Sequence, residues 1–151
     1  MSQKILKVAG YCRVSHDEQK KFGYSISAQV ETIEKWATDK GHKIVNMYVD
    51  EGYSASNMDR PQLQEMLANL HEMDAIVFTR IDRLSRNVLE ANKMLATLRQ
   101  NDVDMIATSE DNVDTTTANR LAVFYFVVKY GLNALATFIK LMLGKVYLKI
   151  K

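Results

Sequence analysis

Four short runs of apolar residues organise the chain up to residue 108. The runs predict β-strands, and they cover residues 5–11, 43–49, 75–79 and 104–108. Between them, apolar residues recur at helical spacing, as in residues 88–101. Strands that alternate with helices predict an α/β fold, with a mainly parallel central sheet of four to five strands flanked by helices.

Polar and special residues mark where the predicted helices begin and end. Ser27 is a suitable N-cap for a helix over residues 28–40, and Gly41 follows in the position that glycine favours after a helix. Pro61 suits the first turn of a further helix, which we expect to continue over residues 62–72.

The pattern changes after the fourth predicted strand. Residues 109–117 are polar and without period, which indicates a loop. Residues 118–143 form a long apolar segment without proline and predict a helix that packs on the domain and on another subunit. A transmembrane span is the alternative, since about 20 apolar residues suffice. Lys129 in its middle opposes that alternative, because a central lysine costs about 2.5–3.5 kcal/mol on insertion scales, so we expect no membrane partner.

We therefore divide the chain into an α/β domain over residues 1–117 and a long helix with a basic tail over residues 118–151. The length of 151 residues suits one domain with a real core.

The lone Cys12 rules out an intrachain disulfide and argues against a zinc site built from cysteines. With no apolar signal region near the N-terminus, a reducing, cytoplasmic setting fits best.

Charge is distributed unevenly along the chain. Residues 1–117 hold 14 of the 20 basic and all 18 acidic residues, a net charge of −4, and the tail holds six basic residues, a net charge of +6. A basic tail beside an acidic body is typical of proteins that contact nucleic acid or a membrane surface. We therefore take Arg120 and Lys145 as candidate DNA contacts. A solvated helix face is the alternative.

A serine and several arginines follow the predicted strands. Ser15 comes two residues after Arg13 at the end of the first strand, and three more arginines lie beside turn residues, namely Arg60, Arg83 and Arg86. Carboxyl ends of parallel strands gather at one edge of a sheet, so these side chains can share a site. Guanidinium groups bind phosphate and stabilise the negative charge that develops during its attack. The pattern therefore indicates a serine that attacks a phosphodiester.

A free hydroxyl is a weak nucleophile, so Ser15 needs a neighbouring group that activates it. His16 is adjacent to Ser15, and neighbours on an extended segment point to opposite faces, whereas Arg13 and Ser15 share one. We therefore favour activation by the arginine cluster over a Ser-His-Asp triad.

Each motif also has a purely structural interpretation. Arg13 can be a surface strand residue and Ser15 a helix cap. Asp82 can form a structural ion pair with Arg83 or Arg86, the segment 59–61 can be only a helix start, and Asp50 can cap a turn or orient an arginine.

The glycines form neither a dinucleotide nor a P-loop fingerprint, and no acidic or histidine cluster has metal-ligand spacing, so we predict no cofactor and no metal.

Four motifs together resemble the catalytic domain of the serine recombinases, which are the resolvases, invertases and large phage or transposon integrases. The motifs are Tyr11-Cys12-Arg13-Val14-Ser15 with Gln19, Ser27-Ala28-Gln29, Asp59-Arg60-Pro61, and Asp82-Arg83-Leu84-Ser85-Arg86. The resemblance runs from about Val8 to Arg120, and the spacing is most like the large integrase branch.

The resemblance implies a site-specific DNA recombinase that needs neither metal nor ATP. Ser15 would form a 5′-phosphoserine link to DNA and free a 3′ hydroxyl, giving integration, excision or inversion. The supporting residues implied are Arg13, Arg60, Arg83 and Arg86 around the scissile phosphate, Asp82 to orient an arginine or help proton transfer, and Gln19 and Gln29 to support the pocket. The partners implied are DNA and further copies of the chain, as a dimer and as a tetramer in the active complex.

Two departures from the family pattern matter, and the first of them supports a rival interpretation that the intact arginine set opposes. The long helix of family members usually carries a Glu-Arg pair, and residues 132–135 here hold neither charge. The family's DNA-recognition domains come after the catalytic domain, so we expect weak, salt-sensitive and largely sequence-blind DNA binding from this chain. The alternative function is a catalytically impaired oligomerisation or regulatory fragment of a recombinase, and a third is a membrane-tethered domain.

Overall fold

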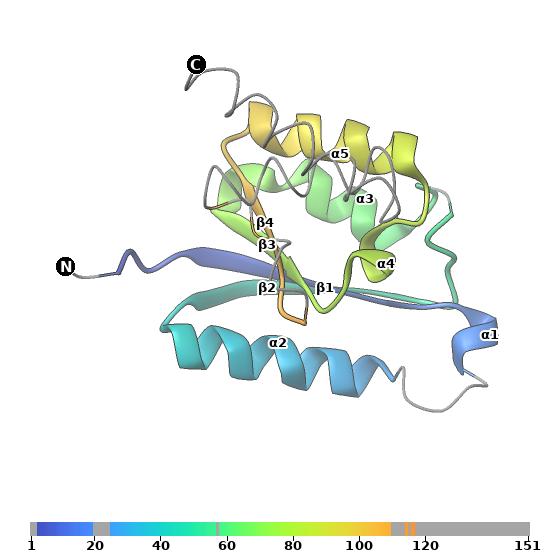
Figure 1. Cartoon of the computed structure of the whole chain (residues 1–151), viewed down its shortest axis with the longest axis horizontal. Coiled ribbons are helices and arrows are strands. Elements are labelled where there is room, and N and C mark those ends of the chain that lie inside the picture. Colours follow the sequence, from blue (N-terminus) through green and yellow to red (C-terminus); the bar gives the residue numbers. More distant parts are fainter. Residues whose placement is uncertain (1–2, 20–24, 57, 110–113, 115, 117–151) are drawn as a thin grey trace, which may run out of the picture.

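The computed structural model of the chain describes residues 3–19, 25–56, 58–109, 114 and 116. Within them, the sheet has four strands, all parallel, in the order β2-β1-β3-β4 (Figure 1). The strands are β1 (Lys7–Val14), β2 (Lys43–Glu51), β3 (Ala75–Phe78) and β4 (Asp104–Ala107). The predicted α/β class with a parallel sheet is confirmed.

Strand β1 lies two to three residues later than the apolar run predicts. Ile5 is 69% exposed and lies before the strand, whereas Cys12 and Val14 are buried within it. The residue between them, Arg13, is also buried, with 1% of its surface exposed. A buried arginine interrupts the apolar pattern, and for that reason the sequence predicts too early an end.

Helices cover both faces of the sheet. Helix α2 (Ile26–Lys40) lies on one face, and α3 (Pro61–Ala68) and α5 (Val88–Gln100) lie on the other (Figure 1). Two one-turn helices follow strands directly: α1 (His16–Gln19) comes after β1 and α4 (Ile81–Leu84) after β3. Both therefore stand at the carboxyl edge of the sheet, where ligands of such folds gather.

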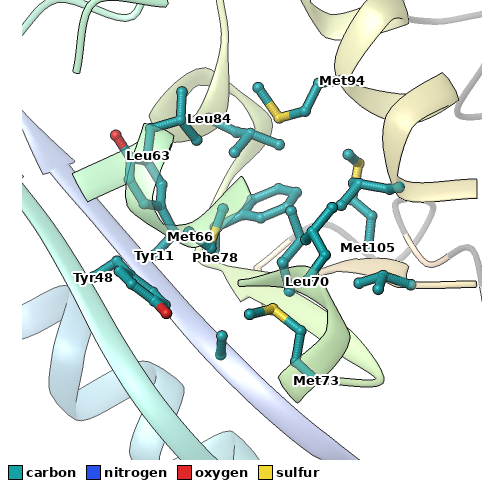
Figure 2. Close-up of a cluster of buried hydrophobic side chains, with 14 of the residues drawn as sticks. Tyr11, Tyr48, Leu63, Met66, Leu70, Met73, Phe78, Leu84, Met94 and Met105 are labelled. Atoms are coloured by element: carbon teal, nitrogen blue, oxygen red, sulfur yellow. The ribbon is translucent and has the colours of Figure 1, made fainter. Parts of the chain in front are cut away.

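Each face of the sheet has its own apolar core. Figure 2 shows the larger one, on the side of α3 and α5, whose labelled members include Tyr11, Leu63, Met66, Phe78, Leu84 and Met94. The core under α2 contains Val8, Cys12, Ile33, Ala37, Ala75 and Val77. Alternate residues of a strand share a face, so Arg13 lies on the same face of β1 as Tyr11. That face turns toward α3 and α4.

Helix α2 begins two residues earlier than predicted. Its N-cap is Ser25, whose Oγ accepts a hydrogen bond from the amide of Ala28 at 3.2 Å, so the assignment of Ser27 was wrong. Both serines are chemically suited to the role, and the local pattern does not distinguish them. The predicted end is confirmed: Gly41 caps the helix with a φ of 71°, in the left-handed region that glycine favours.

Helix α3 begins at Pro61 as predicted but ends at Ala68, so its extension to residue 72 was wrong. The Asn69 side chain donates to the Glu65 carbonyl at 2.9 Å, and a 3₁₀ turn over Leu70–Glu72 follows. Asparagine competes with the helix for backbone partners, and this accounts for the early end.

Several expectations concern residues outside the described ranges. The helix over 118–143, Arg120, Lys145 and most of the loop over 109–117 belong to them. In the described part of that loop, Asp114 forms an isolated antiparallel bridge with Ile106. In the part of the chain that the structure describes, no helix is long and apolar enough to cross a membrane.

Candidate active site

The carboxyl ends of β1, β2 and β3 bring the sequence-predicted residues to one edge of the sheet. Ser15 follows β1, and the turn after β2 is joined to it because the amide of Gly52 donates to the Val14 carbonyl at 2.7 Å. Arg83 lies in α4, directly after β3. Parallel strands thus gather segments that are up to seventy residues apart in the sequence.

Ser15 is half-buried and caps the short helix α1. Its Oγ accepts a hydrogen bond from the amide of Glu18 at 3.2 Å, and its carbonyl accepts one from the amide of Gln19 at 3.0 Å. The cap interpretation of this serine is therefore correct as local structure. The cap hydrogen bond fixes the hydroxyl at the carboxyl edge of the sheet.

Arg13 ties three segments together. Its guanidinium donates to the carbonyls of Arg83 at 3.0 Å, Tyr53 at 2.9 Å and Asp82 at 2.9 Å. It also lies 3.3 Å from a carboxylate oxygen of Glu18. Burial lowers the pKa of Arg13, and the charge on Glu18 opposes this. The surface-residue interpretation of Arg13 was wrong, since the side chain is an internal cross-link.

Gln29 holds the backbone of Arg13 from the opposite helix. The amide of Arg13 donates to Gln29 Oε1 at 3.2 Å, and Gln29 Nε2 donates to the Arg13 carbonyl at 3.0 Å. This paired contact fixes the strand end next to Ser15. Gln19, in contrast, donates to the Glu51 carboxylate at 2.9 Å, and this contact is exposed to solvent at the carboxyl edge of the sheet.

Arg60 belongs to a buried chain of polar groups with Tyr11 and Asp50. Arg60 donates to the Tyr11 hydroxyl at 3.0 Å, and that hydroxyl donates to Asp50 at 2.9 Å. The guanidinium also lies 5.6 Å from the centre of the Tyr11 ring and donates to the Leu84 carbonyl at 2.6 Å. Burial is the largest cause that raises the pKa of Tyr11, which keeps its proton available for Asp50.

The carboxylate of Asp50 also caps helix α3. Its oxygens accept from the amides of Gln62 at 3.0 Å and Leu63 at 2.9 Å. The residue in the N-cap position, Arg60, offers no acceptor of its own, so an acid from the end of β2 satisfies the helix start. Asp50 thus caps a helix and, through Tyr11, also orients an arginine.

Arg83 and Arg86 extend the cluster toward solvent. Arg83 is 2% exposed, and its Nε donates to Asp82 at 3.2 Å while Nη1 donates to the Arg13 carbonyl at 3.3 Å. Burial alone would lower the pKa of Arg83, but hydrogen bonds to Asp82 and Glu18 outweigh it and raise the pKa. The Arg86 side chain is 54% exposed and lies on the solvent side of Glu18.

Glu18 is the residue of this cluster that the sequence reasoning missed. Its carboxylate forms ion pairs with Arg13 at 3.3 Å, with Arg86 at 3.4 Å, and with Arg83. Burial would raise its pKa, but the Arg83 hydrogen bond and the charges of Arg13 and Arg83 outweigh this and lower the pKa. A signal was present, because Ser15 and Glu18 have the spacing of a capping box.

A hollow of about 170 Å³ adjoins the cluster on the side of α2. Gln29 and Arg83 line it together with hydroxyl side chains, which are those of Ser25, Thr32, Thr79 and Ser109. In the described ranges, no group of three His, Cys, Asp or Glu side chains is placed to hold a metal ion.

Comparison with known proteins identifies the class of this fold and site. The sequence model of the family "Resolvase, N terminal domain" matches residues 8–134. The chain is 31% identical over 128 residues to the Transposon Tn917 resolvase of Enterococcus faecalis, an alignment that covers 85% of this chain and 61% of that protein. It is 44% identical over 62 residues to uncharacterized immunity region protein 3 of Bacillus phage phi105, covering 41% and 76% respectively.

Solved structures give the same result. The N-terminal catalytic domain of TP901-1 integrase is similar with a TM-score of 0.72 and 27% identity, over 90% of this chain and 98% of that one. A resolvase family site-specific recombinase from Streptococcus pneumoniae has the same fold, with a TM-score of 0.68 and 24% identity, over 98% of this chain and 100% of that one.

The fold and the family match together define the catalytic domain of a serine recombinase. The chain belongs to the resolvase family, which confirms the resemblance drawn from its motifs. It spans about three fifths of the length of the Tn917 resolvase.

Proposed function

We propose that this chain cuts and rejoins DNA by transesterification, with Ser15 as the nucleophile, in site-specific recombination. The observation that carries the proposal is the meeting of Ser15 with Arg13, Arg83 and Arg86 around the single residue Glu18. A hydroxyl and several guanidinium groups at one rim form the set that attack on a phosphodiester needs.

In the proposed reaction, Ser15 Oγ forms a bond to phosphorus while the bond from phosphorus to the DNA 3′ oxygen breaks. The serine proton leaves and the 3′ oxygen takes up a proton, so a 5′-phosphoserine and a 3′ hydroxyl result. Attack by the 3′ hydroxyl of a partner strand reverses the step and reseals DNA. The phosphoester link conserves the energy of the broken bond, so resealing needs no ATP. The proposal includes no metal, because it assigns stabilisation of the developing negative charge to the guanidinium groups.

The contacts suggest a division of labour among the arginines. Arg86, on the solvent side of Glu18, and Arg83 bind the phosphate oxygens, and Asp82 orients Arg83 through its Nε. Arg13 and Arg60 act mainly as positioning residues, because their donors are directed at the carbonyls of the α4 segment. Gln29 fixes the strand that carries the nucleophile.

The partners in this proposal are DNA and further copies of the chain, as dimers and as tetramers in the synaptic complex. Attraction to DNA phosphates predicts binding that weakens steeply with salt. Arg120 and Lys145 are proposed DNA contacts, and the segment over 118–151 is the proposed oligomerisation element. The proposed place of action is the cytoplasm, with access to DNA. Integration, excision and inversion are the outcomes open to it.

The test is covalent trapping on nicked duplexes whose central sequence is randomised, with adducts detected on denaturing gels and located by mass spectrometry. Wild type should yield an adduct on Ser15. Ser15→Ala should yield none, and Ser15→Asn should yield none while it keeps an N-cap acceptor for α1. Ser25→Ala, which removes the cap of α2 instead, should still yield adducts.

Two results would count against the proposal. Adducts on a residue other than Ser15 would move the nucleophile. If wild type formed as few adducts as Ser15→Asn, the alternative of a catalytically impaired oligomerisation or regulatory fragment would be favoured, and sedimentation would then show whether the chain assembles.

A further inference from the structure

We infer that Glu18 occupies the phosphate position of the DNA-free site and is displaced when a DNA phosphate enters. The inference rests on the proposed function for the identity of the ligand. It adds a residue that controls access to the site, with an acidic side chain where the substrate's own anion is expected to bind.

The contacts of the Glu18 carboxylate resemble those of a bound anion. One oxygen lies 3.3 Å from Arg13 and 3.4 Å from Arg86, and the other pairs with Arg83. The Glu18 side chain is 12% exposed, so the contacts lie inside the site rather than on an open surface. Guanidinium groups bind carboxylate and phosphate with the same two-pronged geometry. The donors that hold Glu18 therefore suit a phosphodiester, and both anions compete for them.

The position of Glu18 also connects this anion to the nucleophile. The amide of Glu18 donates to Ser15 Oγ at 3.2 Å, so one residue holds the arginines with its side chain and the serine with its backbone. Helix α1 has only four residues and is held at its start by this bond. Withdrawal of the carboxylate moves the same short turn, and the Ser15 hydroxyl then loses the partner that fixes it as a cap.

Entry of a phosphate and release of the hydroxyl thus become one event. Without DNA, the three arginines are paired with Glu18, and Ser15 is engaged as a cap. With DNA, the phosphate takes over the arginines, Glu18 turns outward and Ser15 becomes available for attack. Such a site discriminates against small anions, because an entering group has to displace a carboxylate that is held by three guanidinium groups.

The variant that tests this is Glu18→Gln, which keeps the size of the side chain and removes its charge. Binding is measured by fluorescence anisotropy with a random-sequence DNA duplex in a Ser15→Ala background, where no strand is cut. We expect affinity about 3- to 10-fold tighter than that of the parent, because the competing anion is gone.

The matched control is Glu51→Gln. Glu51 lies at the same edge, accepts a hydrogen bond from Gln19, and its replacement changes the net charge equally. If both variants tightened binding by the same factor, net charge alone would explain the effect and the inference would be overturned. It would also be overturned if Glu18→Gln weakened binding, since the carboxylate would then support the arginines rather than compete with DNA.

A measurement on the unmodified side chain covers the case in which the variant folds poorly. In the full chain with ¹³C-labelled glutamate, the Glu18 carboxyl resonance should move toward the value of a solvated carboxylate when the duplex is added. A resonance that stays unchanged at saturating DNA would refute the displacement. These readouts need no strand cleavage, so a failure of covalent trapping and a failure of this inference are separate results.

Discussion

Arg13 and Arg83 hydrogen-bond to each other's main-chain carbonyls. Arg13 Nε donates to the Arg83 carbonyl at 3.0 Å, and Arg83 Nη1 donates to the Arg13 carbonyl at 3.3 Å. The two residues are 70 positions apart in the sequence. This reciprocal contact clamps the end of β1 onto α4, and it makes the position of Ser15, the proposed nucleophile, depend on a segment from the middle of the chain.

The clamp predicts a large loss of stability for Arg13→Lys. Lysine keeps the charge but cannot reach several carbonyls from one planar group, so buried acceptors lose their partners. We expect the free energy of unfolding to fall by about 2 kcal/mol or more. Urea denaturation at pH 7 measures this change.

Arg86→Lys is the matched control for that variant, because the Arg86 side chain is 54% exposed. Its free energy of unfolding should stay within about 0.5 kcal/mol of wild type. The rate of covalent DNA adduct formation should nevertheless fall by about 10²-fold, as for loss of one donor to a developing anion. Equal stability losses in both variants would contradict the structural role of Arg13.

Tyr11→Phe tests the buried polar chain. It removes the hydroxyl between Arg60 and Asp50, and leaves a buried donor and a buried acceptor without this partner. We expect the free energy of unfolding to fall by about 1–3 kcal/mol in urea. Tyr48→Phe is the control, because Tyr48 lies in the same core and its hydroxyl makes no hydrogen bond to the described residues. A loss as large for Tyr48→Phe would show that the polar chain is not the cause.

The pKa of Glu18 predicts how stability depends on pH. The folded-state pKa is lowered, because the Arg83 hydrogen bond and the charges of Arg13 and Arg83 outweigh the effect of burial. Glutamate in the unfolded chain titrates near about 4.3, so the contribution of Glu18 is complete above that pH and is lost as pH falls through the lower folded value.

Glu18→Gln removes this contribution. The charged groups around the carboxylate are Arg13, Arg83 and Arg86, with Asp82 behind Arg83. We expect the difference in unfolding free energy between wild type and Glu18→Gln to shrink from pH 6 to pH 3. Urea titrations across this range measure it. A difference that grew with acidity would mean that the arginines do not hold the carboxylate ionised.

The buried position of Cys12 predicts that its thiol reacts slowly in the folded state. Burial, with a smaller effect from the charge of Glu34, raises the pKa of the thiol to about 12. Only the thiolate reacts readily, so alkylation by iodoacetamide at pH 8 should be at least about 10²-fold slower in the native protein than in urea. Similar rates in both conditions would contradict the buried position.

The sequence predicts the framework of this protein well because the relevant signals are local. Apolar runs locate the strands, and Gly41 and Pro61 mark helix ends through their own backbone preferences. Local signals fail where two residues satisfy the same rule, as for Ser25 and Ser27. They also fail at β1, where a buried arginine is stabilised by acceptors far along the chain.

The same limit applies to the site. The motifs point to Ser15 and the arginines, yet Arg13 and Arg60 also donate to carbonyls of distant segments, and no sequence pattern encodes these contacts. Glu18 has the spacing of a capping box with Ser15, but its side chain contacts arginines 65 to 68 residues away. Those contacts exist only once β1 and β3 lie side by side.

The pairing of β3 with β1 has a consequence for synthesis on the ribosome. A nascent chain that has emerged only as far as residue 70 contains Ser15 and Arg13, but none of the α4 carbonyls that Arg13 requires. The guanidinium then remains hydrated, and Ser15 lies at the end of a sheet that is not yet complete. Under the proposed function, strand cleavage therefore becomes possible only after the segment through Arg86 has left the exit tunnel.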